Sequence, residues 1–435
     1  MFGRRDLLRG GAALAAMAGL SQAFAMGCDA AVPTALVPDA GGLLDLPPGF
    51  SYRLLSSAGA PMADGRFVPG KFDGMAAFQA DGGRTVLVRN HELWPDSDDG
   101  AWASGDAPEG MPIFDAKAVG GTTSLVLSAD GTVESEFISL AGTVRNCGGG
   151  ATPWGSWLSC EEARRSGTPR LVEGHGWIFE VPSAARTPVQ PVPLRALGRF
   201  NHEAAAVDPA SGIVYLSEDL DDGLFYRFLP AEPGRLAAGG RLQACVLDGL
   251  TTTANRDGDW SPRTSRTARW IDLDKVEAPD DDLRLRGADR GAATFVRGEG
   301  LAMAADGSVF LTCTEGGANR KGQIFRYTPA GRDTGTLTLF AEPGDVNVLD
   351  MPDNLVVAPW GALVVCEDGS RLGDNYLRLV TPGGRVVPFA RNAHEGRSEF
   401  CGVCFSPDGR TLYVNVQSPG FTYAIRGPWE SLPNT

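Results

Sequence analysis

Six segments of this 435-residue chain repeat one arrangement of residues that could bind ligands. Each segment opens with an acid or a cysteine, continues through a small residue and an apolar run, and reaches a turn glycine eight or nine residues later. A second apolar run then returns to another polar residue. The opening residues are Asp73, Cys147, Glu203, Glu299, Asp353 and Cys401. The closing residues are Glu92, Glu161 or Glu162, Glu218, Glu315, Glu367 and Asn415.

Two apolar runs joined by a Pro/Asp-Gly turn predict an antiparallel hairpin. Outgoing and returning runs are similar in length, at about 3.3 Å per residue, so the opening and closing residues should meet at one end. The copies lie 48 to 96 residues apart, which leaves room for two further strands in each unit. These features predict an all-β fold, a six-bladed β-propeller. Inner strands of a propeller converge on its channel, so we expect two adjoining rings of these side chains.

Carboxylates gathered at one channel mouth would repel one another strongly unless bound cations neutralised them. We therefore expect a metal centre. Carboxylate oxygens favour hard ions such as calcium. The thiolate of Cys147 does not suit calcium and, with glutamate ligands beside it, indicates iron or zinc. His91 and His202 each precede an acid of the rings, so strand alternation should turn them away into structural roles.

The composition and the N-terminal residues limit which partners and which cellular location we expect for the protein. The formal net charge is −14, with no basic run beyond the N-terminus, which disfavours nucleic acid as a structural partner. Residues 1–25 resemble a twin-arginine signal, with Arg4 and Arg5 before an apolar stretch too short to span a bilayer. We expect export by the twin-arginine machinery, a periplasmic or extracellular location, a linker over residues 26–43, and one propeller domain over residues 44–435.

Two features of this region keep alternatives open. An ordinary secretory signal is the alternative to the twin-arginine signal, and Cys28 is a candidate for lipid attachment.

Export would also permit disulfides. However, Cys160, Cys313 and Cys366 end apolar runs, where cysteine behaves as a small hydrophobic side chain.

These motifs resemble the PhoX-type alkaline phosphatases over most of the mature chain. The most specific segment is NCGGGATPWGSWLSCEE, followed by GRFNHEAAAVDPASGIVYLSED and RGEGLA. The resemblance implies an exported six-bladed propeller that hydrolyses phosphate monoesters. It also implies two ferric ions bridged by an oxide, with three calcium ions beside them.

The resemblance implies a role for each matching residue. Cys147 resembles the thiolate ligand of iron, and Glu203 and Glu299 resemble catalytic carboxylates shared between iron and calcium. Arg297, two residues before Glu299 and expected on the same face, resembles the arginine that binds the phosphate. The remaining assignments are Glu162 and Asp353 as calcium ligands, Glu218, Glu315 and Glu367 as further metal ligands, and Asn415 as a substrate contact.

Two other functions fit a propeller with acids at its channel. One is a calcium-dependent lactonase or phosphotriesterase, for which Asn354 and Asn415 would suit the site, but which requires neither a thiolate nor two acid rings. The other is a non-catalytic binding propeller whose acids hold structural calcium, because one fold hosts many functions. For the phosphatase we expect a small phosphate ester as substrate, no transmembrane anchor, and a monomer.

Overall fold

The computed structural model describes residues 35–102, 109–163, 171, 173–369 and 373–433. The predicted signal over residues 1–25 and Cys28 lie outside the described residues. Of the predicted linker, residues 35–43 are described. Val37 pairs with Leu46, and the Tyr52 hydroxyl donates a hydrogen bond of 2.7 Å to Asp39, so this stretch lies against the domain. No helix in the described part of the chain is long and apolar enough to cross a membrane.

The described residues form five antiparallel sheets. Two sheets come from the first part of the chain. One contains β3 (Phe72–Gln79), β4 (Thr85–His91), β5 (Gly120–Leu127) and β6 (Val133–Thr143), and the other contains β7 (Gly150–Ala151), β8 (Ser156–Cys160) and β9 (Ile178–Pro182). Two further sheets combine strands from the last part of the chain with one N-terminal strand each. The first contains β20 (Pro352–Val357), β21 (Leu363–Glu367), β22 (Tyr376–Val380), β23 (Val386–Asn392) and the N-terminal β1 (Leu44–Asp45). The second contains β24 (Phe400–Phe405), β25 (Leu412–Val416), β26 (Phe421–Arg426) and the N-terminal β2 (Ser51–Ser57).

The fifth sheet has ten strands. It runs from β10 (His202–Val207) through β11 (Val214–Glu218), β12 (Gly223–Pro230), β13 (Gly240–Leu247) and β14 (Ser265–Asp272), and then back through β19 (Thr334–Ala341), β18 (Gln323–Pro329), β17 (Val309–Cys313) and β16 (Gly298–Met303), with β15 (Thr294–Phe295) paired to β12. The helical segments are short: α1 (Leu283–Asp289), η1 (Asp81–Gly83), η2 (Arg195–Leu197), η3 (Leu236–Ala238) and η4 (Trp429–Ser431).

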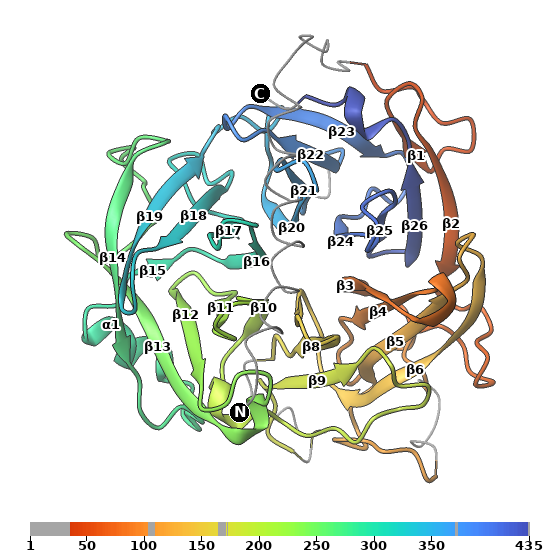
Figure 1. The fold of residues 1–435 in the computed structure, drawn as a ribbon, viewed down its shortest axis with the longest axis horizontal. Helices are drawn as coiled ribbons and strands as arrows, with labels where there is room; N and C mark the ends of the chain where they lie inside the picture. The colour runs from red at the N-terminus through yellow and green to blue at the C-terminus, as the bar shows by residue number, and fades with distance from the viewer. Residues whose placement is uncertain (1–34, 103–108, 164–170, 172, 370–372, 434–435) are drawn as a thin grey trace, which may run out of the picture.

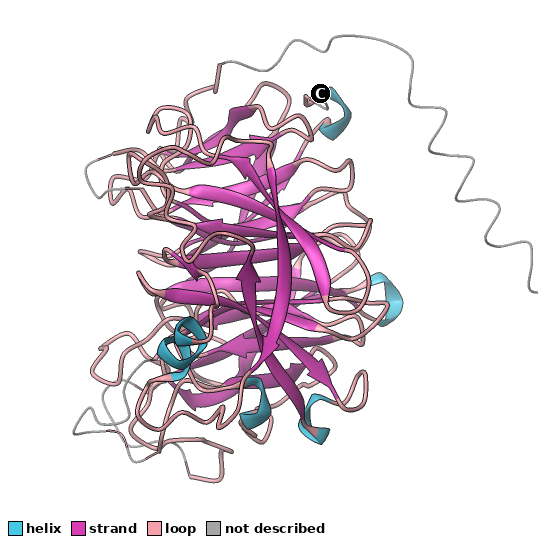
Figure 2. Ribbon diagram, turned by 90° about the vertical axis from the view of Figure 1, so that its left-hand side faces the viewer, coloured by secondary structure: helices cyan, strands magenta, loops and turns pink. Residues whose placement is uncertain are grey.

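The sheets are arranged radially around a centre, with one strand of each repeat innermost (Figure 1). Each inner strand contacts the next one, in the order β3, β7, β10, β16, β20 and β24, and β24 contacts β3 again, so the inner strands close a ring. The N-terminal β2 supplies the outermost strand of the sheet that contains the C-terminal β26, which ties the two ends of the domain together. Seen from the side, loops lie at both ends of the strands (Figure 2).

The predicted all-β, propeller-like architecture is confirmed, but six separate sheets are not observed. β14 pairs with β13 on one side and with β19 on the other, which joins two radial units along their outer edges. The unit formed by β7, β8 and β9 has three strands rather than the four expected. Sequence spacing allows room for strands, but it does not specify which edges they pair with.

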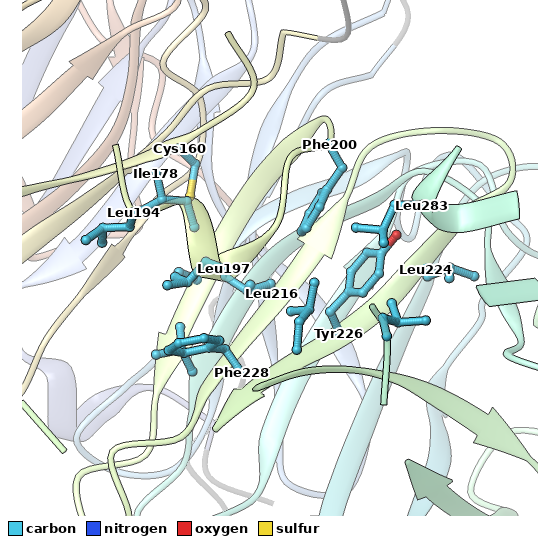
Figure 3. Packing of buried hydrophobic residues seen from close by; sticks show 14 of the residues in the cluster. Cys160, Ile178, Leu194, Leu197, Phe200, Leu216, Leu224, Tyr226, Phe228 and Leu283 are labelled. Carbon is cyan, nitrogen blue, oxygen red and sulfur yellow. The ribbon is translucent and has the colours of Figure 1, made fainter. Parts of the chain in front are cut away.

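The core lies between neighbouring sheets. Along β12, Leu224, Tyr226 and Phe228 alternate with Phe225 and Arg227, and both sets are buried because a sheet packs on each face. The first set packs with Leu197 and Leu216 in one cluster (Figure 3). Burying a side chain of this size contributes about 1.5–3 kcal/mol. Such packing on both faces holds the radial sheets in place and fixes where their inner ends point.

The small residues that follow the opening residues allow the inner strands to converge. A Cβ on Gly74 would lie 1.7 Å from the carbonyl oxygen of Gly148, and a Cβ on Gly300 would lie 2.7 Å from that of Asp353. These partners are backbone atoms of the neighbouring repeat, which cannot rotate away as a side chain can. Glycine at these positions therefore sets how closely the opening residues approach one another.

Candidate metal centre

A β-bulge follows the first paired residue of the inner strand in five of the repeats, and in four of them it contains the opening residue. Phe72 pairs with His91, but the next pair is Met75 with Arg89, so Asp73 and Gly74 oppose one residue. The same extra residue follows His202, Gly298, Pro352 and Cys401. Bulges bend a strand and redirect its side chains. Here the bulge places Asp73, Glu203, Glu299 and Asp353 at the channel mouth.

These side chains line a cavity of about 540 Å³. It contains Asp73, Cys147, Glu203, Glu299 and Asp353, one residue after each paired position. Acids from the returning strands line it as well, and Glu399 joins them from the segment before β24. The residues on the returning side are Glu92, Glu162, Asp219 and Asp368. The predicted convergence of widely separated acids and a thiol is therefore observed.

In three repeats a basic side chain enters the same cavity from the residue before the paired position. Lys71, Arg145 and Arg297 all have left-handed backbones, with φ of 47°, 44° and 53°. Their carbonyl oxygens accept hydrogen bonds from the backbone N–H groups of Glu92, Glu162 and Thr314. Left-handed backbone is uncommon outside glycine, and these hydrogen bonds hold it in place. Three cations from these positions thus face the acids, and Arg397 lines the cavity as well.

Arg297 and Arg145 make specific ion pairs at the cavity wall. Arg297 donates through Nε and Nη2 to the two oxygens of Asp219, both at 2.8 Å, and its Nη2 lies 3.3 Å from Glu299. Hydrogen bonding to Asp219 raises the pKa of Arg297. Arg145 donates to Glu92 and, at 3.0 Å, to Glu162. Both guanidinium groups therefore remain charged and have fixed orientations.

The described residues contain three groups of three possible metal ligands, and within each group the ligand atoms lie within 4.8 Å of one another. The groups are Asp73, Glu92 and Cys147; then Cys147, Glu162 and Glu203; then Glu203, Glu299 and Asp353. Cys147 and Glu203 each belong to two groups. The three candidate sites consequently form one continuous cluster rather than separate positions.

Charge repulsion in this cluster is severe. Burial, followed by the charges of Glu299 and Asp353, raises the pKa of Glu203 well above its ordinary value. Burial also raises the pKa of Glu299, with Asp219 as the next contributor, and that of Asp353, with Asp73 next. Among the described residues, the buried Oε2 of Glu203 has no hydrogen-bond partner. Cations would reverse this repulsion and satisfy that oxygen.

Four predicted site residues do not line the cavity. Glu218 accepts hydrogen bonds from the Tyr226 hydroxyl and the Leu224 N–H, and Glu367 accepts from the Arg378 guanidinium and the Asp350 N–H. Glu315 lies 3.4 Å from the exposed Arg320. Asn415, also behind the cavity wall, donates to the Asp73 carbonyl oxygen.

For three of these four residues the reason is strand alternation. Glu218, Glu367 and Asn415 occupy the paired positions opposite His202, Pro352 and Cys401. Neighbouring residues on a strand point to opposite sides. The cavity therefore receives Asp219 and Asp368, one residue later. The predicted structural roles of His91 and His202 follow from the same rule, since their ring nitrogens contact Gly70 and Thr123 in one case and Gly198 in the other.

Cys401 is likewise not a member of the ring. Its paired position is equivalent to that of His202, and the equivalent of Glu203 is Gly402. The Cys401 thiol is buried against the Phe72 carbonyl oxygen at 2.9 Å. The ring is thus incomplete at the sixth repeat. All the cysteines that the structure describes are free thiols, Cys245 included.

Comparison with known proteins assigns the family. The model of the alkaline phosphatase PhoX family matches residues 33–136 and 118–420. The chain belongs to the PhoX alkaline phosphatase family. It is therefore a phosphatase, and the lactonase and the non-catalytic binding propeller are set aside. Among curated proteins, the search finds no match.

A solved structure of a PhoX protein shares the fold of this PhoX family member. PhoX from Pseudomonas fluorescens, solved with vanadate as a transition-state analogue, has a TM-score of 0.68 at 19% identity, covering 92% of this chain and 98% of that chain. A gluconolactonase from Xanthomonas campestris has a TM-score of 0.44 at 14% identity, covering 88% and 98%.

The PhoX-type cavity contains residues that sequence reasoning missed. Asp219 and Asp368 directly follow the glutamates that were selected, and Lys71 and Arg145 stand at the same offset from the ring as Arg297. The signal was present, because each of the segments KFD, RNC and RGE has a basic residue two positions before the ring residue. Glu399 precedes β24 and follows no such pattern.

Proposed function

We propose that this protein hydrolyses phosphate monoesters at a mixed iron and calcium centre in the channel mouth. The observation that carries the proposal is the continuous cluster in which Cys147 and Glu203 are each shared between groups of ligand atoms. A single thiol among many carboxylates is the donor set of one softer ion beside several hard ones. The family assignment supports the reaction, and the cluster supports the metals.

The residues present fit such a centre. Cys147 with Glu162 and Glu203 would hold iron, whereas Glu203, Glu299 and Asp353 offer only carboxylate oxygens and would hold calcium. The unpartnered Oε2 of Glu203 is available as a ligand atom. When bound, the ions supply positive charge that offsets the negative charge of the ester and of the transition state.

The cationic side chains would bind and orient the ester. A phosphate monoester is a dianion at alkaline pH, and a planar guanidinium can donate two parallel hydrogen bonds to its oxygens. Arg297 and Arg145 both line the cavity, with orientations fixed by Asp219, Glu92 and Glu162. We assign Arg297 to phosphate binding and Arg145 as a second donor. Lys71, hydrogen-bonded to Ser418 at 2.9 Å, provides a third positive charge at the rim.

The remaining sequence predictions belong to this proposal. The ten-stranded sheet is interpreted as two blades fused through β14, which makes a six-bladed propeller. The Arg4-Arg5 motif supports export by the twin-arginine machinery and a periplasmic or extracellular location. The enzyme is proposed to act as a monomer on small phosphate esters.

Hydrolysis of p-nitrophenyl phosphate by exported, folded protein supplied with iron and calcium tests the proposal. We expect activity that requires both metals and is inhibited by vanadate, which binds the Pseudomonas fluorescens relative as a transition-state analogue. Arg297→Lys should lower kcat/KM by about 10²-fold, because an ammonium cannot form the paired hydrogen bonds. The exposed Arg195→Lys serves as the matched control. Absence of hydrolysis by protein with its full metal content would overturn the proposal.

A further inference from the structure

A second cavity, of about 620 Å³, adjoins the metal centre. Arg145, Glu162, Asp219 and Arg297 line both cavities. The guanidinium groups assigned to phosphate binding therefore stand at the boundary between them. A phosphate ester held there can place its leaving group in the second cavity without displacing any side chain of the first.

Trp94 provides a flat apolar surface in this second cavity. The segment after β4 carries it, and the residue is 45% exposed. The Arg145 guanidinium carbon lies 4.9 Å from the centre of its ring, so Arg145 covers one face of the indole and the opposite face is the one available for stacking. Exposed tryptophan is uncommon on a soluble protein, and its ring is a suitable surface for stacking another flat ring.

The remaining wall offers hydrogen-bond acceptors. Asp221 and Asp222 are exposed carboxylates in the turn between β11 and β12. Asn201 is buried, and its amide donates to Glu162 and to the Asp219 carbonyl oxygen. Its Oδ1 has no hydrogen-bond partner among the described residues. Arg284, paired with Asp222 at 2.9 Å, closes this side.

Resting on the proposed phosphatase function, we propose that the second cavity is a leaving-group subsite that favours nucleoside monophosphates. A nucleoside carries a flat base that can stack on Trp94. It also has sugar hydroxyls that can donate to the carboxylates of Asp221 and Asp222. An aliphatic leaving group such as glycerol has the hydroxyls but no ring. Trp94 is thus a specificity-determining residue outside the metal cluster.

Steady-state kinetics of the metal-loaded enzyme on adenosine 5′-monophosphate and on glycerol 2-phosphate test the proposal. Trp94→Ala should lower kcat/KM for the nucleotide about tenfold to a hundredfold, the range expected for loss of one stacked base. Glycerol 2-phosphate should lose less than about twofold. Trp94→Phe should recover most of the loss, since a ring is restored. Phe67→Ala, which removes an exposed aromatic side chain that lines neither cavity, is the matched control.

The outcomes separate this proposal from the function on which it rests. If the unmodified enzyme hydrolyses neither ester, the phosphatase proposal fails. If it hydrolyses both and Trp94→Ala lowers both equally, Trp94 acts only by supporting Arg145 and the subsite is refuted. An unchanged rate on the nucleotide refutes it as well. Only a loss confined to the nucleotide, with rescue by phenylalanine, supports it.

Discussion

Glu218 and Asp219 are adjacent in the chain, yet their carboxylates lie on opposite sides of one strand end. Asp219 lines the acid-rich cavity of about 540 Å³ and accepts two hydrogen bonds of 2.8 Å from Arg297. Glu218 faces the core, where the Tyr226 hydroxyl donates to it at 2.7 Å and burial raises its pKa to about 7. The same acidic pair therefore provides one group for the site and one for the fold.

This relationship predicts opposite phenotypes for two neutral substitutions. Asp219→Asn should lower kcat/KM at least tenfold with little change in stability, because it loosens Arg297. Glu218→Gln should leave kcat/KM nearly unchanged and alter the free energy of unfolding by about 1–3 kcal/mol, because a buried acceptor for two donors is altered. Kinetics and urea unfolding of both variants check this. A Glu218→Gln variant that is stable but inactive would contradict the assignment.

Replacing the thiol should affect one metal selectively. We expect Cys147→Ser to lose iron and most activity while retaining calcium, because the carboxylate-only group formed by Glu203, Glu299 and Asp353 remains. Elemental analysis of purified protein measures both ions. The buried Cys245→Ser, whose thiol lies in the core, is the control for thiol loss. A full iron content in Cys147→Ser would exclude the thiolate as an iron ligand.

Removing the ions should weaken the fold as well as the activity. Without cations, repulsion between Glu203, Glu299 and Asp353 acts against the convergence of the inner strands. An ion that binds the native state but not the unfolded state stabilises the native state by about 4 kcal/mol when the free ion concentration is a thousand times Kd. We therefore expect chelation to lower Tm by several degrees and calcium to restore it. A Tm that is insensitive to chelation would count against ions at these positions.

The packing of the inner strands predicts a severe effect from a single methyl group. Gly74→Ala would bring a Cβ against the backbone of Gly148 and should cost about 1–3 kcal/mol or more. Because the neighbouring strand would have to move, metal content should fall too. Gly41→Ala is the milder comparison, because its nearest neighbour, at 3.1 Å, is a side-chain oxygen of the half-buried Asp39 rather than a backbone atom. Equal stability of the two variants, by thermal unfolding, would contradict the close approach.

His175 predicts a stability change with pH. Burial alone would lower its pKa, but Glu161, at 2.6 Å, and Asp115, at 3.4 Å, outweigh that effect and raise it. A raised pKa means that the folded state retains a proton which the unfolded state has released. The stabilisation is thus complete below about pH 6.5 and is lost as pH rises through the folded pKa.

We expect the difference in unfolding free energy between the unmodified protein and His175→Gln to be largest near pH 6 and to decrease toward pH 9. Urea titrations across this range measure it, with His394→Gln as the control for loss of a half-buried histidine. A difference that is constant with pH would show that His175 does not gain a proton on folding.

Much of the architecture follows from local sequence. Repeated apolar runs with turn glycines specify antiparallel hairpins, because hairpin formation depends on the local order of residues. The acids at the hairpin ends indicate bound cations, because like charges brought together repel one another. Cys147, Glu162, Glu203, Glu299, Asp353 and Arg297 are found together at the channel mouth as expected. The fusion of two radial units through β14 was not foreseeable, since strand edges pair according to their position in space.

The sequence by itself determined that acids and one thiol would meet at the inner ends of repeated hairpins. Only the tertiary structure decided which of two neighbouring residues faces the cavity. Composition and spacing do not show which member of the pair Glu218 and Asp219, or of the pair Cys401 and Gly402, faces the cavity. A one-residue bulge changes the register, and a shift of one residue on a strand turns the side chain to the other face.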